Sequence, residues 1–334
     1  MATTVCVTGA NGFIASHIVQ QLLLKGYAVR GTVRDASSEA KTAHLKSLQG
    51  ADTLLELFSV DLVGEPGRWD ECVAGCAAVF HTATPIPIGV KDGKAEIYEP
   101  AMGSTKELLD ACAKTSCVKT FILTSSMSAV APQPEPPVKT EAHWSDDSVQ
   151  ESKGNWYGCT KTRQERLVEQ TLAGSAIRYI AICPTGVFGP MLQPNINMTM
   201  GWMANMAKGP SDGQARNDSM SFIDVRDCAA MHIAGLEKAD ASGRYMSIAG
   251  TPSGRRTGDG AIVYESTHWN DIYAIVKTLH PAMPDFAPCD GEPVVPTSFD
   301  LTKMNTLLHV DEMRDVKTIF RDGFQALRAK GALS

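Results

Sequence analysis

The first half of the chain alternates short apolar runs with amphipathic stretches. The apolar runs are rich in β-branched residues and stop at small or polar residues, which predicts buried strands. These predicted strands cover residues 3–8, 28–33, 54–58, 77–81, 119–124 and 177–183. The predicted helices between them, with apolar residues at helical spacing, cover residues 12–25, 38–48, 66–75, 95–115 and 157–173. This alternation predicts an α/β fold with a doubly wound parallel sheet of the Rossmann type and about seven strands.

The pattern changes after Pro184. Residues 186–221 are rich in Met, Asn, Gly and Pro, and we expect them to be irregular. The strand–helix pattern returns over residues 222–248, whereas the polar, glycine-rich residues 249–260 are expected to form a mobile loop. Two further helices are predicted at 269–280 and 311–329.

This change of pattern predicts two interleaved domains. A nucleotide-binding domain comprises residues 1–185 plus 222–248, and a smaller α/β substrate-binding domain comprises residues 186–221 plus 249–334. Ligands of open parallel sheets bind at the carboxyl ends of the strands, so the functional residues are expected there.

The clearest chemical signal lies between the first predicted strand and the first predicted helix. Gly9-x-x-Gly12-x-x-Ala15 follows the strand that ends at Thr8. Gly9 permits a tight turn, Gly12 lets a pyrophosphate approach the backbone, and the small Ala15 lets the helix pack on the strand. The helix N terminus attracts anions, so this loop predicts a dinucleotide phosphate site.

A second signal is the pair Tyr157 and Lys161, which lie one helical turn apart and project from one face. A phenol has an ordinary pKa near 10, and a neighbouring ammonium group lowers it. The pair therefore predicts a proton donor for a carbonyl oxygen that receives a hydride. Because the spacing is common, a coincidental pair on a solvated helix is the alternative.

A third signal is the strand FILTSS (121–126), which ends in hydroxyl groups. Ser126 is placed to hydrogen-bond the same carbonyl oxygen as Tyr157. The other hydroxyl groups nearby, on Thr124, Ser125 and Ser128, are expected to satisfy backbone groups at the strand end.

Composition narrows the class of protein. With 334 residues, 43% of them hydrophobic, the chain can bury a large core. Its net charge of −6 and the lack of a basic block argue against nucleic-acid and membrane partners. The nine cysteines form no cluster with His, so we expect reduced, mostly buried thiols and no metal site. No apolar run reaches the roughly 20 residues that span a bilayer. Because the nucleotide loop also begins so near the N terminus, we expect a cytoplasmic protein without a signal peptide.

Together these segments closely resemble the extended short-chain dehydrogenase/reductases, in particular the dihydroflavonol reductase, cinnamoyl-CoA reductase and yeast methylglyoxal (carbonyl) reductase group. The resemblance covers nearly the full length and rests on eight ordered blocks. These blocks are VTGANGFIASHIV (7–19), TVRD (32–35), VDL (60–62), VFHTATP (79–85), FILTSSMSAV (121–130), NWYGCTK (155–161), CPTGVFGP (183–190) and FIDVRDCAAMHIAGLE (222–237).

The resemblance implies roles for individual residues. Ser126 would orient the substrate carbonyl, Tyr157 would be the acid, and Lys161 would bind the nicotinamide ribose and lower the pKa of Tyr157. The other cofactor-binding positions would be Gly9, Asn11, Gly12, Phe13 and Ile14 in the pyrophosphate loop, Asp61 and Leu62 beside the adenine, Thr82, Ala83 and Thr84 along the nicotinamide ribose, and Pro184 and Val187 at the carboxamide.

The choice between NADPH and NADH depends on the end of the second strand. An enzyme that uses NAD usually has an acidic residue there to bind the ribose hydroxyls. This strand ends at Val33-Arg34, and Lys41 follows seven residues later. Arg34 can stack on adenine and pair with a 2′-phosphate, which favours NADPH. Asp35 leaves a competing interpretation, as a ribose-binding carboxylate or a helix N-cap.

The substrate is less constrained. Similar dihydroflavonol reductases carry Asn or Asp five residues after the catalytic Ser, and here that residue is Ala131. A CoA thioester stays possible, with Arg255 and Arg256 either meeting a CoA phosphate or lying on a solvated loop. An apolar, Met-rich pocket is expected, and membership of the core is the alternative for several of its residues. Its candidate residues are Ile86, Met127 and Met191, with Ile88, Leu192, Met198, Met200, Trp202 and Met203 nearby.

Two motifs outside this set are expected to be structural. His17, on the first helix, is assigned to packing or the surface. Asp224 and Asp227 look like a paired-carboxylate site, but in similar enzymes this segment forms hydrogen bonds across the domain interface.

We therefore expect an NADPH-dependent reductase that converts a ketone or aldehyde to an alcohol, acting as a monomer or homodimer on a small molecule. An acyl-CoA reductase and a non-catalytic NADP-binding regulatory protein are the alternatives. An epimerase or dehydratase is also conceivable on this scaffold. The physiological substrate is not specified by the sequence.

Overall fold

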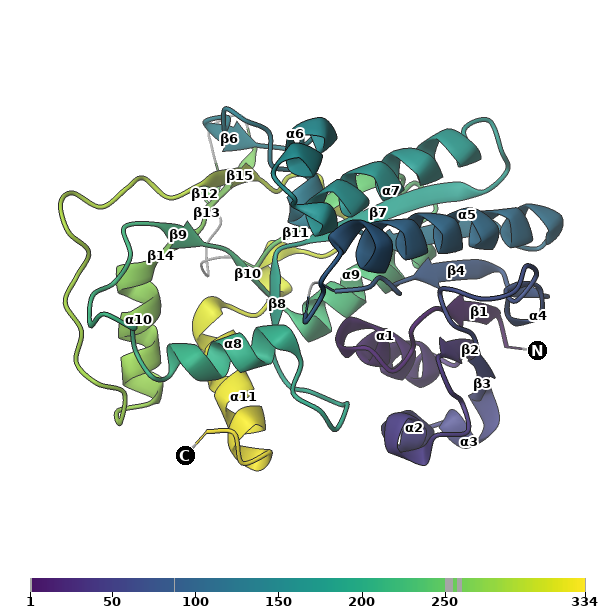
Figure 1. The fold of residues 1–334 in the computed structure, drawn as a ribbon, viewed down its shortest axis with the longest axis horizontal. Helices are drawn as coiled ribbons and strands as arrows, with labels where there is room; N and C mark the ends of the chain where they lie inside the picture. Colours follow the sequence, from purple (N-terminus) through teal and green to yellow (C-terminus); the bar gives the residue numbers. More distant parts are fainter. Residues whose placement is uncertain (1, 87, 250–254, 257–259, 334) are drawn as a thin grey trace.

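The computed structural model describes residues 2–86, 88–249, 255–256 and 260–333. Its centre is a seven-stranded sheet in the order β11-β7-β5-β4-β1-β2-β3 (Figure 1). All neighbouring strands are parallel. These strands are β1 (Thr4–Val7), β2 (Ala28–Val33), β3 (Leu55–Ser59), β4 (Ala78–His81), β5 (Thr120–Thr124), β7 (Arg178–Pro184) and β11 (Gly243–Ser247). The predicted doubly wound sheet is confirmed.

Helices cover both faces of this sheet. Successive side chains of a strand point to opposite faces, so β1 places Cys6 on one side and Val5 and Val7 on the other. The Cys6 face packs against α4 (Asp70–Val73), α5 (Glu99–Lys114) and α7 (Trp156–Leu172). The opposite face packs against α1 (Phe13–Leu24) and α9 (Val225–Glu237). Two smaller helices, α2 (Glu39–Lys46) and α3 (Ala51–Leu54), connect β2 to β3.

Some predicted helix limits differ from the observed ones. The helix predicted over 66–75 is only the four-residue α4. The helix predicted over 95–115 opens with a π-helical turn, η1 (Lys94–Tyr98), before it continues as α5. The predicted helix at 311–329 begins at Val316, after the short 3₁₀ turn η4 (Val310–Glu312).

Most of the remaining elements form a second, smaller α/β unit beside the carboxyl ends of the large sheet (Figure 1). Three small sheets pair β8 with β10, β9 with β14, and β12, β13, β15 and β6 in that order. Their strands are β6 (Val138–Lys139), β8 (Gly186–Phe188), β9 (Ser219–Met220), β10 (Phe222–Asp224), β12 (Arg255–Arg256), β13 (Ile262–Glu265), β14 (Thr267–His268) and β15 (Ser298–Asp300). The helices of this unit are α8 (Met198–Met206), α10 (Trp269–Leu279) and α11 (Val316–Ala329). By contrast, α6 (Asp147–Ser152) and the 3₁₀ turn η2 (Met127–Ala129) pack against α7, and the 3₁₀ turn η3 (Met304–Thr306) packs against β11.

The prediction that residues 186–221 are irregular is wrong for α8. Met200, Met203 and Met206 are buried against α11 in the core of the smaller unit. Met198 and Trp202 of the same helix are exposed, so apolar residues lie on several faces and hide the helical period. Packing against α11 therefore stabilises a helix that the local sequence pattern does not predict.

The two-domain division remains a proposal, and one strand pair bears on it. β6 lies within residues 1–185, yet it pairs in parallel with β15 of the smaller unit. The loop predicted over 249–260 falls largely on residues 250–254 and 257–259, which lie outside the described residues. Arg255 and Arg256 form β12, antiparallel to β13.

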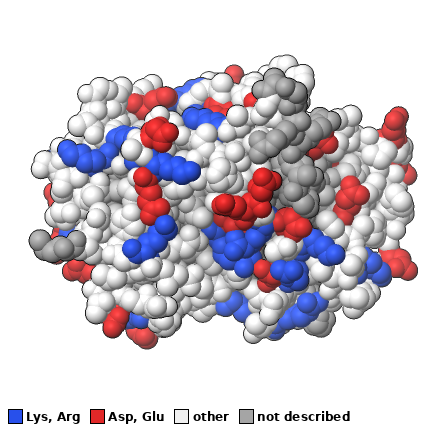
Figure 2. Space-filling view, turned by 180° about the vertical axis from the view of Figure 1, so that it is seen from behind, with Lys and Arg blue, Asp and Glu red and all other residues white. Residues whose placement is uncertain are grey.

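The exposed surface carries charges of both signs. Acidic and basic side chains lie next to one another over the face shown in Figure 2. Eight of the nine cysteines are buried, as predicted, and Cys117 is exposed. In the described part of the chain, no cluster of His, Cys, Asp and Glu side chains is suited to hold a metal ion. Within those same residues, no helix has both the length and the apolar character required to cross a membrane.

Candidate active site

The glycine loop connects β1 to α1 at the carboxyl edge of the large sheet. Gly9 has a φ of +62°, and a Cβ there would lie 3.1 Å from the Cβ of Ala83. Gly12 is the N-cap of α1, whose first turn has neither a capping side chain nor an acidic residue. The first amide groups of α1 are therefore suited to bind an anion, as the sequence predicted for this loop. Asn11 lies in the loop between the two glycines and is half-buried.

The segment after β4 lies against this loop. Thr8 Oγ1 accepts hydrogen bonds from the backbone N–H groups of Thr82 and Ala83, over 3.0 and 3.1 Å. Thr84 Oγ1 accepts a hydrogen bond of 2.8 Å from Lys161 Nζ. The three residues predicted to line the nicotinamide ribose thus connect the glycine loop to the Tyr157 helix.

The end of β2 carries the residues expected to select the cofactor. Arg34 is largely exposed, and its Nε lies 3.3 Å from Oδ2 of Asp61. Asp35 Oδ1 instead accepts hydrogen bonds from the Ser37 backbone and hydroxyl, over 3.0 and 2.6 Å. Those bonds lower the pKa of Asp35, and the charge of the exposed Lys41 contributes in the same direction. Asp35 therefore closes a local turn here, and the N-cap of α2 is Ser38.

The three predicted catalytic residues lie close together at the end of β5. Ser126 follows this strand as the N-cap of η2, and its Oγ accepts from the Ser128 backbone over 3.1 Å. Ser126 lies near enough to the Tyr157 hydroxyl to lower the pKa of that phenol. Lys161 Nζ is buried, lies 5.9 Å from the centre of the Tyr157 ring, and donates to the Thr124 carbonyl over 2.8 Å.

The electrostatic expectation for Tyr157 needs a correction. The sequence predicted that Lys161 lowers the pKa of this phenol, whereas burial raises it above its usual value of 10. The nearby Ser126 side chain acts in the opposite direction on the pKa of Tyr157 and is the smaller effect. Burial also lowers the pKa of Lys161, to about 7, so the ammonium form is itself disfavoured in this state. Both shifts have one cause, because a poorly solvated site penalises the charged form of each group.

A buried polar network extends from Lys161 and was not predicted. Gln164 Oε1 lies 3.4 Å from Lys161 Nζ, and Gln164 Nε2 donates to Thr105 Oγ1 over 2.7 Å. His81 bridges Thr105 Oγ1 and Thr8 Oγ1, with 3.0 Å to each. Because Thr8 Oγ1 already accepts two backbone N–H groups, its proton points to His81 Nδ1, and Nε2 carries the imidazole proton. Burial lowers the pKa of His81 to about 3, which keeps the ring neutral.

The remaining predicted residues are more dispersed. Pro184 ends β7, and Val187 is buried in the core of the smaller unit. Phe13 and Ile14 pack against the same core, which joins α1 to it. Leu62 packs on the α5 face of the sheet, and its carbonyl accepts a hydrogen bond from Arg68.

Of the three predicted substrate residues, only one lines the cavity found beside Ser126. That residue is Met127, next to Ser126 in the chain. Met191 is buried in the core of the smaller unit, and Ile86 is exposed after β4. This cavity differs from the apolar pocket expected from the sequence, because serine and threonine hydroxyl groups form much of its wall, and the apolar pocket stays a prediction.

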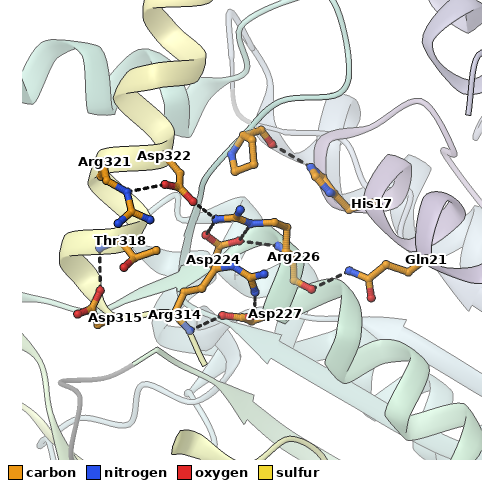
Figure 3. Close-up of polar contacts among 11 residues, drawn as sticks. His17, Gln21, Asp224, Arg226, Asp227, Arg314, Asp315, Thr318, Arg321 and Asp322 are labelled. Carbon is orange, nitrogen blue, oxygen red and sulfur yellow. Dashed lines mark hydrogen bonds and ion pairs between the residues drawn. The ribbon is translucent and has the colours of Figure 1, made fainter. Parts of the chain in front are cut away.

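The carboxylates of the FIDVRD segment make structural contacts, as predicted (Figure 3). Asp224 accepts two hydrogen bonds from Arg226, of 2.8 and 2.7 Å, and Arg226 reaches on to Asp322 of α11 over 2.7 Å. Asp227 pairs with Arg314. These contacts hold α9 against α11.

His17 is part of the packing between α1 and the smaller unit. Its Nε2 lies 2.9 Å from the Pro190 carbonyl, and burial lowers its pKa to about 4 (Figure 3). The neutral ring therefore fixes the segment after β8, in agreement with the packing role expected from the sequence.

Known proteins share this fold and these sequence blocks. The NAD dependent epimerase/dehydratase family matches residues 5–249. Cinnamoyl-CoA reductase CAD2 of Medicago truncatula is 36% identical over 301 residues, which covers 89% of this chain and 87% of the relative. A bifunctional dihydroflavonol 4-reductase/flavanone 4-reductase of Malus domestica is 33% identical over 289 residues, covering 85% and 77% of the two chains. The NADPH complex of Gre2 from Candida albicans superimposes with a TM-score of 0.79 at 25% identity, covering 98% and 99% of the two chains.

These relatives are reductases, which supports an oxidoreductase activity for the present chain. The family match covers more than half of the chain, and the two plant enzymes align over most of their own length. The resemblance predicted from the eight sequence blocks is therefore confirmed, and the chain belongs to the NAD dependent epimerase/dehydratase family of extended short-chain dehydrogenase/reductases.

Proposed function

We propose that this protein reduces a ketone or aldehyde to an alcohol with NADPH as the reductant. One observation carries the proposal: Ser126, Tyr157 and Lys161 converge at the carboxyl end of β5, and Lys161 reaches Thr84 beside the glycine loop. A hydroxyl pair and a buried lysine next to a dinucleotide loop suit hydride transfer to a carbonyl better than a purely structural role.

The residues present fit a dinucleotide. A side chain at Gly9 would meet Ala83, so the turn requires glycine, and the start of α1 has no side-chain cap, which leaves its first N–H groups to a phosphate. Arg34 and Lys41 favour NADPH because they supply positive charge at the end of β2. The hydrogen bonds between Asp35 and Ser37 support this preference, because they hold the Asp35 carboxylate in a local turn and away from the role of binding ribose hydroxyls. The NADPH complex of the Candida albicans protein is consistent with the same cofactor here.

The chain's own residues would manage the proton and the position of the carbonyl. NADPH, when bound, supplies the hydride. Ser126 donates a hydrogen bond to the carbonyl oxygen and fixes its place, and the Tyr157 hydroxyl donates its proton to that oxygen as it gains negative charge. The raised pKa of Tyr157 keeps the phenol protonated at neutral pH, which suits a proton donor. Lys161 fixes the Thr84 hydroxyl and the end of β5.

An acyl-CoA reductase is the second candidate, and the 36% identity to a cinnamoyl-CoA reductase favours it. The two reactions differ in their products, because reduction of a thioester releases a free thiol. A thiol assay on a panel of acyl-CoA esters with NADPH distinguishes them. A regulatory NADP-binding protein would bind NADPH and oxidise none of it.

The test of the proposal is the loss of NADPH absorbance with a panel of ketones and aldehydes. Tyr157→Phe should lower kcat by roughly 10²–10⁴-fold, the usual contribution of a general acid, with NADPH affinity unchanged. Tyr27→Phe is the matched control, because the Tyr27 hydroxyl bonds Glu237 on the surface. Turnover retained in Tyr157→Phe would contradict the mechanism.

A further inference from the structure

A cavity of about 290 Å³ opens beside Ser126, between η2 and the small sheets of the second unit. Its wall is rich in hydroxyl groups and contains one lysine, Lys139, at the end of β6. The hydroxyl groups belong to Ser128, Ser219, Ser221, Ser266 and Thr297. Ligand cavities usually have roughly 300–1,000 Å³, so this one is suited to a compact molecule.

The cavity is connected to the proposed catalytic hydroxyl. Ser126 Oγ donates to Ser128 Oγ over 3.2 Å, and Ser128 lines the cavity. On another side, Ser221 lies 2.9 Å from Thr185 Oγ1, next to Pro184 at the end of β7. The cavity therefore lies where a substrate with its carbonyl at Ser126 has room for its remaining atoms.

Lys139 is the charged residue of the wall. Its side chain is 9% exposed, and its Nζ lies 2.6 Å from Glu135 Oε1 and 5.5 Å from the centre of the Phe299 ring. An ammonium group has three donors, so the contact with Glu135 does not exhaust them. Glu135 is 44% exposed, so solvent weakens its pairing with Lys139, whose own largely buried side chain lines the cavity beside Phe299.

The hydroxyl groups complete a polar wall. Ser219 Oγ and Ser266 Oγ lie 2.7 Å apart, and Ser266 also donates to the Thr297 carbonyl over 3.3 Å. Each hydroxyl can rotate to donate to an oxygen of a ligand. A lysine with several hydroxyl donors in a half-enclosed space matches a carboxylate better than an aromatic ring, because charged hydrogen bonds are the stronger ones.

We propose that the cavity binds the carboxylate of a short oxo acid, with Lys139 as the residue that selects it. The proposal rests on the function proposed above and specifies its substrate class. The carbonyl lies at Ser126 and Tyr157, and the carboxylate lies at the Lys139 end of the cavity. The reaction itself is unchanged, since Lys139 takes no part in proton or hydride transfer.

Three methyl ketones of similar size test the proposal: levulinate, 2-hexanone and 5-hydroxy-2-pentanone. The wild-type protein should show a kcat/KM for levulinate at least about tenfold above that for either neutral ketone, the lower end of what a charged hydrogen bond contributes. Lys139→Met should remove this preference mainly by raising KM for levulinate. It should leave kcat/KM for 2-hexanone within about twofold of the wild-type value. Lys139→Arg should restore most of the preference. Glu135→Gln should raise kcat/KM for levulinate, because it removes the carboxylate that competes for Lys139.

Lys106→Met is the matched control. Lys106 also pairs with an acidic residue four positions away, Asp110, but lies exposed on α5. Its replacement should leave kcat/KM for all three ketones unchanged. Unchanged turnover of 2-hexanone by Lys139→Met also shows that this variant is folded.

Two results would overturn the inference. One is a Lys139→Met protein that reduces levulinate as well as the wild type does, and the other is equal preference for the acid and the hydroxy ketone. If no ketone is reduced at all, the proposed function fails instead. Levulinate binding to the NADP⁺-loaded protein, followed by saturation-transfer NMR, then decides the inference: loss of the signal in Lys139→Met supports it, and a retained or absent wild-type signal overturns it.

Discussion

Arg244 Nε lies 2.6 Å from Glu165 Oε2, and both side chains are almost completely buried beneath the end of β5. Glu165 also accepts a hydrogen bond from Ser125, the neighbour of Ser126. The Arg244 guanidinium donates to the carbonyl groups of Ala129, over 2.9 Å, and His143, over 2.6 Å. This ion pair therefore joins α7, β11 and the end of β5, and it fixes both ends of the segment that carries Lys139.

Replacing Glu165 by Gln should cost about 3–5 kcal/mol of unfolding free energy, because it leaves Arg244 buried without a counter-charge. Urea denaturation measures the loss. Glu237→Gln serves as the control, since Glu237 pairs with Lys25 at the surface over 3.0 Å, where such a pair is worth at most about 1 kcal/mol. Equal losses of unfolding free energy in the two variants would show that the buried pair contributes no more to stability than the surface pair.

Gly9→Ala should destabilise the protein and weaken NADPH binding together. A left-handed backbone costs a non-glycine residue roughly 1–2 kcal/mol, and the new Cβ would also crowd Ala83 at 3.1 Å. Gly26→Ala is the matched control, because Gly26 has a φ of +82° and nothing within 4 Å of the added Cβ. Gly26→Ala should lose stability with unchanged NADPH affinity, measured by protein fluorescence. Normal NADPH affinity in Gly9→Ala would contradict the assigned loop.

Local patterns predicted what depends on local physics. The β-branched runs and the helical spacing around Gly9 predicted the large sheet and α1, because burial on both faces leaves a continuous apolar signature. The Ser126, Tyr157 and Lys161 triad came from short motifs that recur at fixed spacing. The hydrogen bond between Lys161 and Thr84 agrees with that prediction, although the roles of these residues remain proposals.

Contacts between distant segments were not predictable. Gln164, Thr105 and His81 form one network from three separate elements, and no single segment of the sequence marks them as partners. The same holds for Lys139, which follows a proline-rich loop and meets Phe299 only because β6 pairs with β15. The lowered pKa of Lys161 also depends on tertiary burial, and this burial reversed the electrostatic prediction for Tyr157.

The proposed preference for NADPH is tested at the end of β2. Arg34→Asp should reduce kcat/KM for NADPH by roughly 10–100-fold, the value of a charged hydrogen bond to a phosphate. It should change kcat/KM for NADH much less. Lys41→Met should have a smaller effect in the same direction. Lys46→Met is the control on α2, because Lys46 pairs with Glu39 over 2.7 Å and is half-exposed. An unaltered NADPH-to-NADH ratio in Arg34→Asp would exclude Arg34 from the phosphate site.

The buried Lys161 should make stability depend on pH. Burial lowers its pKa from 10.5 to about 7, so between these values the unfolded chain binds more protons than the folded one. Stability from this group therefore rises as pH increases from about 7 towards 10.5 and is progressively lost as pH falls from 10.5 to about 7, with a slope of at most about 1.4 kcal/mol per pH unit. Subtracting the profile of Lys161→Met removes the contribution of every other titrating group.

The measurement is urea denaturation of the cofactor-free protein at pH 6 to 9. Wild type minus Lys161→Met should be flat below about pH 7 and should rise above it, because a neutral lysine is accommodated in a site that disfavours the ammonium group. Parallel profiles across this range would mean that Lys161 keeps its ordinary pKa. Its hydrogen bonds to Thr84 and Thr124 would then offset its desolvation. In that case Lys161 would carry its positive charge throughout, and this charge would oppose the effect of burial on the pKa of Tyr157.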